Sequence, residues 1–174
     1  GVTGVQVASV VPGVTLSTAN LALSVNTIVI NGAGFDATVA TNNVVTFNNG
    51  AEGVVQPASA TQLTVAFDTG KRPAAGNLTA VVTTNGTSSG TAVRVATVVP
   101  VVTLSTTTTL ASDATTVLVN GSGFSTTAAN NTVVFSSGAI GTVQSATAIR
   151  LTVTLSKRPM AGILTARVTT NGVQ

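Results

Sequence analysis

The sequence contains no cysteine, no histidine, no tryptophan and no tyrosine. Without cysteine the chain forms no disulfide and supports no thiol chemistry. Without histidine it lacks the commonest general base and the commonest metal ligand of proteins. Faces that bind sugars usually stack Trp or Tyr against the rings, so their absence weakens a carbohydrate-binding interpretation. We expect a protein with no bound metal and no cofactor.

Charged residues are also scarce, at 6% of the chain, whereas hydrophobic residues make up 44%. Disordered chains are charge-rich and poor in apolar residues, so this chain is expected to fold. The net charge of +3 is spread along the sequence, whereas nucleic-acid binders cluster their positive charge. The apolar runs are short and are interrupted by residues such as Arg94 and Pro100, which predicts no transmembrane helix. We therefore expect neither nucleic-acid binding nor membrane insertion.

The strongest positive feature is an internal repeat. Three blocks of the first half recur in the second half: 7–17 as 95–105, 30–35 as 119–124, and 71–86 as 157–172. The first of these blocks keeps nine of its eleven residues. This self-similarity predicts two copies of one module. We place them at residues 9–95 and 96–174, with a separate segment at residues 1–8 in front.

Hydrophobic and polar residues alternate within each module, which is the pattern of half-buried strands. In "TQLTVAF", for example, Leu63, Val65 and Phe67 share one face of the expected strand. Val81 is replaced by Arg167 in the second copy, so this position must face solvent, and the register of its strand follows. The strands expected in the first module are 7–11 with 14–16, 27–31, 43–47, 54–56, 61–67, 77–84 and 91–95. About seven short strands per module predict an all-β fold built from two-sheet sandwiches.

Several motifs of both modules occur in the same order. They are "SVVP" and "TVVP" after the opening residues, a strand ending in Gly-x-Gly-Phe, "VVTF" or "VVFS", and finally "ASATQLTV" and "AGNLTAVVTTNG". Together they resemble the immunoglobulin-like IPT/TIG domain, over nearly the whole chain and twice. The resemblance implies two immunoglobulin-like β-sandwich domains in tandem. It implies no single activity, because such domains occur in transcription factors, receptors, bacterial surface proteins and polysaccharide enzymes.

The second module is expected to lack its own last strand. Gln174 corresponds to Ser88 of the first module and Gly1 corresponds to Ser89, so the strand absent from the second module matches residues 1–8. A sandwich without its last strand exposes unpaired backbone groups along one edge. We expect residues 1–8 of a neighbouring subunit to fill this edge by β-strand addition.

The match assigns residues to both sides of this contact. Four donor residues correspond to positions of the 89–95 strand: Thr3, Val5, Gln6 and Val7. Gln6 corresponds to Arg94 and should face outward, while the other three should face inward. The acceptor residues are the inward positions of the second module's neighbouring strand: Leu164, Ala166, Val168 and Thr170. Such a heterologous contact need not close on itself, and open contacts of this kind generate filaments.

The expected function is therefore a structural subunit of an extracellular filament or surface fibre, with other copies of itself as partners, head to tail. Three alternatives remain at this point. One is a truncated piece with an arbitrary boundary, although the complementarity of its two ends argues against an accident. The same sequence relationship arises if 174 residues are one period of a very long chain of tandem modules. A different function is a non-catalytic carbohydrate-binding or spacer pair in a larger secreted protein.

Catalytic groups are not expected to converge. The four acids of the chain have no acidic counterparts in the other copy: Asp36, Glu52, Asp68 and Asp113. Paired carboxylates and a histidine-based triad are thus both unsupported, and we predict that the protein is not an enzyme. The glycines of each Gly-x-Gly-Phe motif are expected to adopt positive φ so that Phe35 and Phe124 turn into the core.

Two surface features have more than one interpretation. The turns "GKRPAAG" and "SKRPMAG" are best explained as solvated turns, and the alternative is contact with acidic glycans or an anionic neighbour. Four asparagines fit the Asn-x-Ser/Thr pattern of N-glycosylation: Asn77, Asn85, Asn120 and Asn130. A surface glycan is therefore a further candidate partner.

Overall fold

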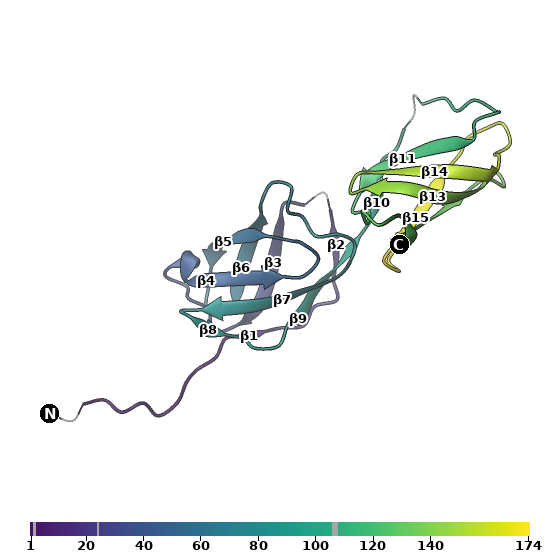
Figure 1. The fold of residues 1–174 in the computed structure, drawn as a ribbon. Coiled ribbons are helices and arrows are strands. Elements are labelled where there is room, and N and C mark those ends of the chain that lie inside the picture. Colours follow the sequence, from purple (N-terminus) through teal and green to yellow (C-terminus); the bar gives the residue numbers. More distant parts are fainter. Residues whose placement is uncertain (2, 24, 106–107) are drawn as a thin grey trace. The chain divides into compact units, whose positions relative to one another are not determined.

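The structure is a computed structural model that describes residues 1, 3–23, 25–105 and 108–174 (Figure 1). Its regular elements are β-strands apart from two 3-10 turns, η1 (Ala40–Asn42) and η2 (Ala128–Asn130). The described residues contain no α-helix, so the predicted all-β class is confirmed. Over the same residues, no helix has the length and apolar character needed to span a membrane.

The first repeat forms two sheets. One sheet has the strand order β1 (Gly13–Val14), β3 (Thr27–Ala33), β6 (Gln62–Phe67), β5 (Gly53–Ala58). The other has the order β2 (Asn20–Ala22), β9 (Val93–Val99), β7 (Gly76–Thr84), β4 (Asn43–Phe47), and β8 (Thr87–Ser88) also pairs with β7. β2 runs parallel to β9, whereas β4 and β8 run antiparallel to β7. This is an arrangement compatible with an immunoglobulin-like sandwich.

The second repeat keeps the first of these sheets and part of the second. Its larger sheet has the order β10 (Val101–Val102), β11 (Thr116–Ser122), β14 (Arg150–Lys157), β13 (Ile140–Thr147). Its other sheet contains β12 (Asn131–Phe135) and β15 (Ala166–Thr170). β12 and β15 correspond to β4 and β7, so the second sheet has two strands where the first repeat has five.

Contacts along the chain define two compact units that differ slightly from the two repeats. The first unit comprises Gly1–Thr18, Asn26–Arg72 and Thr79–Val95, and the second comprises Ala19–Val25, Pro73–Leu78 and Ala96–Gln174. Most of each repeat lies in one unit, while two short segments of the first repeat cluster with the second unit.

The alternating pattern predicted the inward faces correctly in both repeats. Leu63 and Val65 in β6 are fully buried, and so are their counterparts Leu151 and Val153 in β14. Arg167 is exposed, as the exchange of valine for arginine at this position requires. β-branched residues in this alternation form strands because their side chains pack well on a pleated, half-buried surface.

Some of the expected strands differ from those observed. Residues 7–11 form no strand, the segment expected at 14–16 is reduced to β1, and the short strands β2 and β8 were not predicted. The physical reason for the first difference lies in the second copy of the same sequence. Residues 95–99 belong to β9, which lies between β2 and β7, and a strand of this kind requires such partners.

Each Gly-x-Gly-Phe motif ends a strand with the phenylalanine turned inward, as predicted, and Phe35 is only 5% exposed. Gly34 has φ +76°, which favours glycine. Gly32 is required for another reason than the predicted positive φ: a Cβ atom there would lie 2.1 Å from the Gly13 carbonyl oxygen and 2.4 Å from the Phe35 ring. The second copy repeats these relations at Gly121, Gly123 and Phe124.

Candidate assembly site

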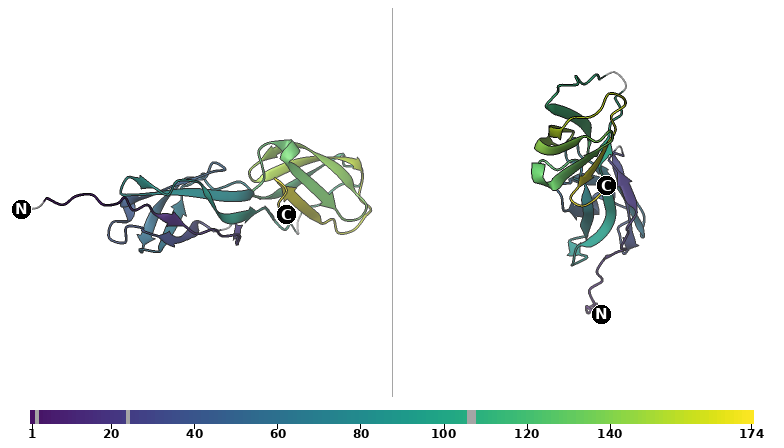
Figure 2. Two further views of the ribbon diagram at one scale, coloured as in Figure 1. Left: turned by 90° about the horizontal axis from the view of Figure 1, so that it is seen from below. Right: turned by 90° about the vertical axis from the view of Figure 1, so that its right-hand side faces the viewer.

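Within the described residues, β15 is paired with another strand along one edge only. Its five residues pair with β12 in the register Asn131↔Thr170 to Phe135↔Ala166. Along the opposite edge, the described residues supply a single isolated bridge between Thr170 and Val173. β7 in the first repeat pairs with β4 in the same register and has β9 on its opposite edge. We call the edge of β15 that corresponds to the β9 side of β7 the acceptor edge (β15 is yellow in Figure 2).

The side chains beside the acceptor edge are less buried than their counterparts. Leu78 and Ala80 in the first repeat are fully buried, whereas Leu164 and Ala166 are only partly buried. Val168 remains 3% exposed, because it points directly into the core. The hydrophobic core of the second repeat is therefore less completely covered at the start of β15 than the first core is at β7.

The same difference extends through the second core. Seven hydrophobic side chains pack against it while only partly buried: Leu110, Val117, Val133, Val143, Ala146, Leu164 and Ala166. In the first repeat, the counterparts of five of these are buried: Leu78 and Ala80, already described, and Ile28, Val45 and Val55. The seven side chains of the second repeat still expose apolar surface to water. Burying that surface would contribute about 25 cal/mol of stability per Å².

β15 is also shorter than β7. It spans five residues, Ala166–Thr170, against the nine of Gly76–Thr84. The four preceding residues, 162–165, lie outside any strand. Since strand pairing holds the backbone extended, a β7-like segment that has a partner on one edge only is expected to shorten in this way.

Thr170, one of the four predicted acceptor residues, has its side chain committed within its own repeat. Its hydroxyl donates to Asn131 Oδ1 at 2.9 Å, and the residue is fully buried. The remaining amide bonds of Asn131 are made with the backbone of Ser125 and Thr127. Thr170 can therefore offer a neighbour its backbone groups but not its hydroxyl.

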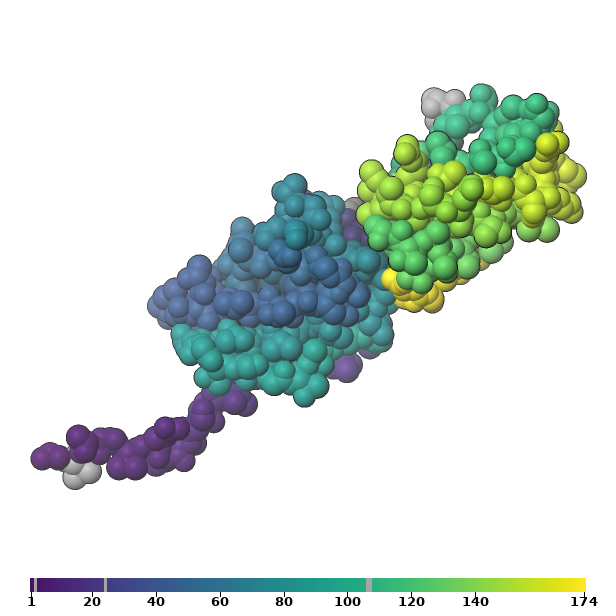
Figure 3. Space-filling model, viewed as in Figure 1, coloured from purple at the N-terminus to yellow at the C-terminus, as the bar shows by residue number. Residues whose placement is uncertain are grey.

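The predicted donor residues lie in an exposed N-terminal segment, residues 3–11. This segment contains no strand, and in the space-filling view it stands clear of the folded body of its unit (Figure 3). Thr3 and Gln6 are exposed, and Val5 and Val7 are 80% and 96% exposed. The counterpart of Val7 in β9 is Val95, which is 4% exposed. The same short sequence is thus solvated in one copy and buried in the other.

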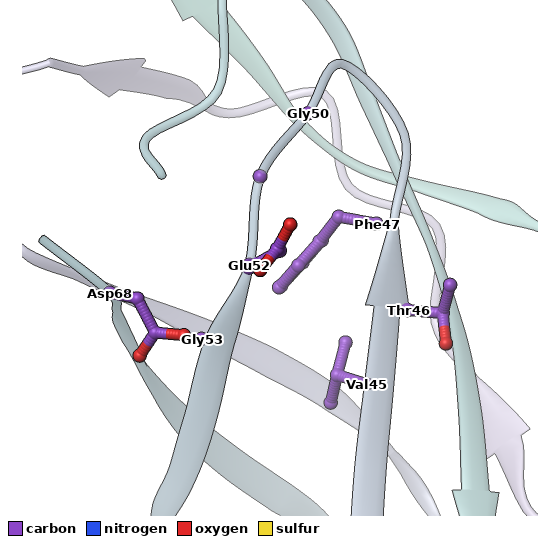
Figure 4. Close-up of a pocket in the computed structure, with 8 residues that line it drawn as sticks. Val45, Thr46, Phe47, Gly50, Glu52, Gly53 and Asp68 are labelled. Carbon is purple, nitrogen blue, oxygen red and sulfur yellow. The ribbon is translucent and has the colours of Figure 1, made fainter. Parts of the chain in front are cut away.

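A shallow hollow of about 490 Å³ lies between β4 and β5 in the first unit. Figure 4 shows the ring of Phe47 and the carboxylates of Glu52 and Asp68 around it. Lys71 Nζ forms an ion pair with Glu52 Oε1 at 2.8 Å, and this carboxylate raises the pKa of Lys71. The charge of Asp68 also raises the pKa of Lys71, so both carboxylates beside the hollow act on the same lysine. Among the described residues, no three His, Cys, Asp or Glu side chains form a group that could hold a metal ion.

A second hollow of about 330 Å³ lies beside the end of β11 and is lined by Asn120, Thr147, Ile149 and Arg150. Its lining mixes a single cation with an aliphatic side chain and two neutral polar groups. None of these is buried, so nothing in the hollow preorganises a ligand.

The four asparagines of the glycosylation pattern are all exposed. Asn77 lies in β7, Asn120 in β11, Asn130 in η2 and Asn85 in the turn after β7. Asn85 Nδ2 donates to Asp36 Oδ2 at 3.3 Å, and Asn130 Nδ2 donates to Ser125 Oγ at 3.3 Å.

The two Lys-Arg-Pro turns differ in their contacts. In the first, Lys71 pairs with Glu52 and the Arg72 guanidinium donates to the side chain of Asn26. In the second, Lys157 and Arg158 are exposed. Both turns expose their cations to solvent. An exposed ion pair such as that of Lys71 and Glu52 contributes little to stability.

Both repeats share a buried polar group that was not predicted from the sequence. Asn43 is 3% exposed and Asn131 is 4% exposed, and each fastens the loop before its strand to the sheet. The signal was present, since "NN" precedes the "VV" strand and "TTNG" ends the partner strand in both copies. Asparagine is mostly found at the surface, which is why the pattern was not interpreted in this way.

The chain matches no family model, no curated protein and no solved structure. The site is therefore defined by the contrast between the two repeats.

Proposed function

We propose that this protein is a structural subunit of an extracellular filament or surface fibre, and that its subunits join head to tail by β-strand donation. Residues 1–8 of one copy enter the acceptor edge of β15 in the next. One observation carries the proposal: along the described residues the acceptor edge pairs with no strand and carries only the Thr170–Val173 bridge, while the sequence that covers the same edge in the first repeat recurs, exposed, in the N-terminal segment.

An open strand edge beside a partly covered core favours this kind of binding. Its N–H and C=O groups offer a template for an extended segment, and main-chain pairing supplies affinity while alternate side chains supply specificity. Val5 and Val7, at 80% and 96% exposed, are the side chains available to cover the core. Burial of a valine contributes about 1.5 to 3 kcal/mol, and each ladder hydrogen bond contributes about 1 kcal/mol.

Polymer formation follows from the placement of the two partners in different units. The N-terminal segment belongs to the first unit and β15 belongs to the second. A subunit that donates with one unit and accepts with the other makes a heterologous contact, which propagates unless the rotation between subunits closes a ring.

We also propose that both repeats are IPT/TIG-type domains and act without catalysis. The Gly-x-Gly-Phe turns after β3 and β11 and the shared strand order support this assignment. The extracellular location is supported by Asn85, an exposed asparagine of the glycosylation pattern in the turn after β7, because this modification is found on surface loops of secreted proteins. A glycan on the asparagines of this pattern is the proposed additional surface partner.

Sedimentation of the intact chain and of a variant lacking residues 1–8 tests the proposal. We expect polymers from the intact chain and monomers from the deletion variant. Monomers from both would favour the spacer or carbohydrate-binding alternative, and equal polymerisation of both would contradict strand donation. The mass under strong denaturation is expected to stay near 17.0 kDa if the subunits are separate chains.

A further inference from the structure

β9 lies inside its sheet, between two neighbours. β7 lies along one side, and β2 runs parallel along the other in the register Asn20↔Thr97 to Ala22↔Val99. Two further backbone hydrogen bonds extend this second side, from Ser17 N to Arg94 O and from Thr97 N to Ala19 O, both at 2.8 Å. β9, whose sequence recurs in the N-terminal segment, is therefore a strand with hydrogen bonds along both edges.

The second repeat contains a counterpart of β2. "TLA" at residues 109–111 corresponds to "NLA" at residues 20–22. These residues form no strand, although Leu110 already packs, partly buried, against the second core. β2 is a strand because it pairs with β9. Residues 109–111 have a matching sequence, but within the described residues they have no β9-like strand to pair with.

The buried part of β9 continues beyond the positions matched by residues 1–8. Val95, Ala96 and Val98 are 4%, 3% and 0% exposed. The counterpart of Val98 is Val10, which is 81% exposed. Pro12 corresponds to Pro100, which follows the last residue of β9. Since proline has no N–H to donate to a ladder, it marks the same boundary in both copies.

We infer that the donated strand comprises residues 5–11, that it inserts between β15 and residues 109–111, and that Val10 is its second anchor, opposite Leu110. This inference rests on the proposed head-to-tail assembly and identifies the residues that determine its specificity. Leu21 and Val98 are partners in the first repeat, and Leu110 and Val10 are their respective counterparts. Residues 109–111 become a parallel strand when the donor arrives.

Insertion on two sides has a kinetic consequence that addition at one edge lacks. Release of the donor must break two ladders and expose Val7 and Val10 together. Affinity differences among related complexes reside mostly in the dissociation rate, so assembled subunits should separate slowly. The assembled strand order would also repeat the order β2, β9, β7 of the first repeat.

Two substitutions and one matched control test the inference. Val7→Asp and Val10→Asp each introduce a charge that insertion would bury, and we expect either to raise the concentration needed for polymerisation by roughly tenfold or more. Gln6→Arg is the control, because the first repeat carries Arg94 at this position, and it should polymerise like the parent chain. All three positions are exposed in the single chain, so unchanged thermal unfolding of the monomers verifies that the variants fold.

Hydrogen exchange provides the second measurement. The amides of Leu110 and Ala111 should exchange more slowly in polymers of the parent chain than in Val7→Asp monomers. If Val7→Asp blocks polymers but Val10→Asp does not, or if these amides gain no protection on assembly, the two-sided insertion is wrong while strand donation stands. If neither aspartate variant affects polymerisation, both the insertion and the proposed assembly are wrong.

Discussion

The Thr84 hydroxyl donates a hydrogen bond to Asn43 Oδ1 at 3.0 Å. Asn43 Oδ1 also accepts a hydrogen bond from the Asp36 N–H at 2.9 Å, and Asn43 Nδ2 donates to the Asp36 carbonyl oxygen at 2.8 Å. One buried amide thus ties β4 to β7 and to the preceding loop. Buried polar groups that are fully paired in this way fix a single arrangement, and the second repeat preserves the same arrangement around Asn131.

Replacing Asn43 or Asn131 by alanine should destabilise the corresponding repeat by about 1 to 3 kcal/mol, because each change leaves buried backbone groups and a threonine hydroxyl without partners. Denaturant unfolding measures the loss. Asn31→Ala is the control, since Asn31 is exposed and, among the residues that the structure describes, its side chain accepts a hydrogen bond only from the exposed Gln62. Its effect should lie within about 0.5 kcal/mol; equal losses in all three variants would contradict the role of the buried amide.

The stability of the first repeat should depend on pH in the acid range. The Asp36 carboxylate accepts from Asn42 Nδ2 at 2.8 Å and from the Val39 and Thr38 N–H groups at 2.9 Å each. These bonds lower its pKa from 3.8 to about 2. Because the unfolded chain then binds the proton more tightly, the contribution of Asp36 to stability is present above about pH 4 and is lost as the pH falls towards 2.

The second repeat supplies the control for this pH dependence. Its counterpart of Asp36 is Ser125, whose Oγ accepts from the Thr127 N–H at 3.2 Å without titrating in this range. Asp36→Ser should therefore flatten the acid limb of the unfolding free energy plotted against pH. An unchanged profile in this variant would assign the acid sensitivity to another group.

The first glycine of each Gly-x-Gly-Phe motif should tolerate no side chain. Gly121→Ala would place Cβ 2.1 Å from the Val101 carbonyl oxygen and 2.3 Å from the Phe124 ring. Relief requires the strand pair and the ring to move apart, at about 1 to 3 kcal/mol. Gly13→Ala has nothing within 4 Å and should be nearly neutral in thermal unfolding. Comparable losses in both variants would contradict the close approach as the cause.

Strands with strong alternation were predictable from the sequence because each carries its own inward face. β6, β7 and β14 are strands of this kind, and the positions that they bury were predictable for the same reason. Residues 7–11 were wrongly predicted as a strand because the same sequence is a strand only when β7-like and β2-like neighbours flank it. Local pattern does not report whether those neighbours are present, so pairing overrides propensity here.

The candidate site was predictable in outline because the two repeats could be compared with each other. Three acceptor positions, Ala166, Val168 and Thr170, lie in β15 as its match to β7 predicts, whereas Leu164 was expected in the strand and lies before it. The commitment of the Thr170 hydroxyl to Asn131 was not predicted, because asparagine is mostly found at the surface, although "NN" and "TTNG" recur in both copies. Residues 20–22 were missed for a related reason: a three-residue parallel strand is too short to show a period.

Leu164 and its counterpart Leu78 differ in burial. Leu78 is fully buried, so Leu78→Ala should cost about 2 to 5 kcal/mol in any assembly state. Leu164 is partly buried in the single chain, so Leu164→Ala should cost less there, because part of the removed surface already contacts water.

In polymers the cost of Leu164→Ala should rise towards that of Leu78→Ala, since an inserted strand would cover the core beside β15. Denaturant unfolding of a non-polymerising background and of assembled material gives the two values for each substitution. Leu78→Ala is expected to give the same value in both, which makes it the internal reference. An equal cost of Leu164→Ala in both states would mean that assembly leaves this flank of the second core uncovered, and strand donation at the acceptor edge would then be wrong.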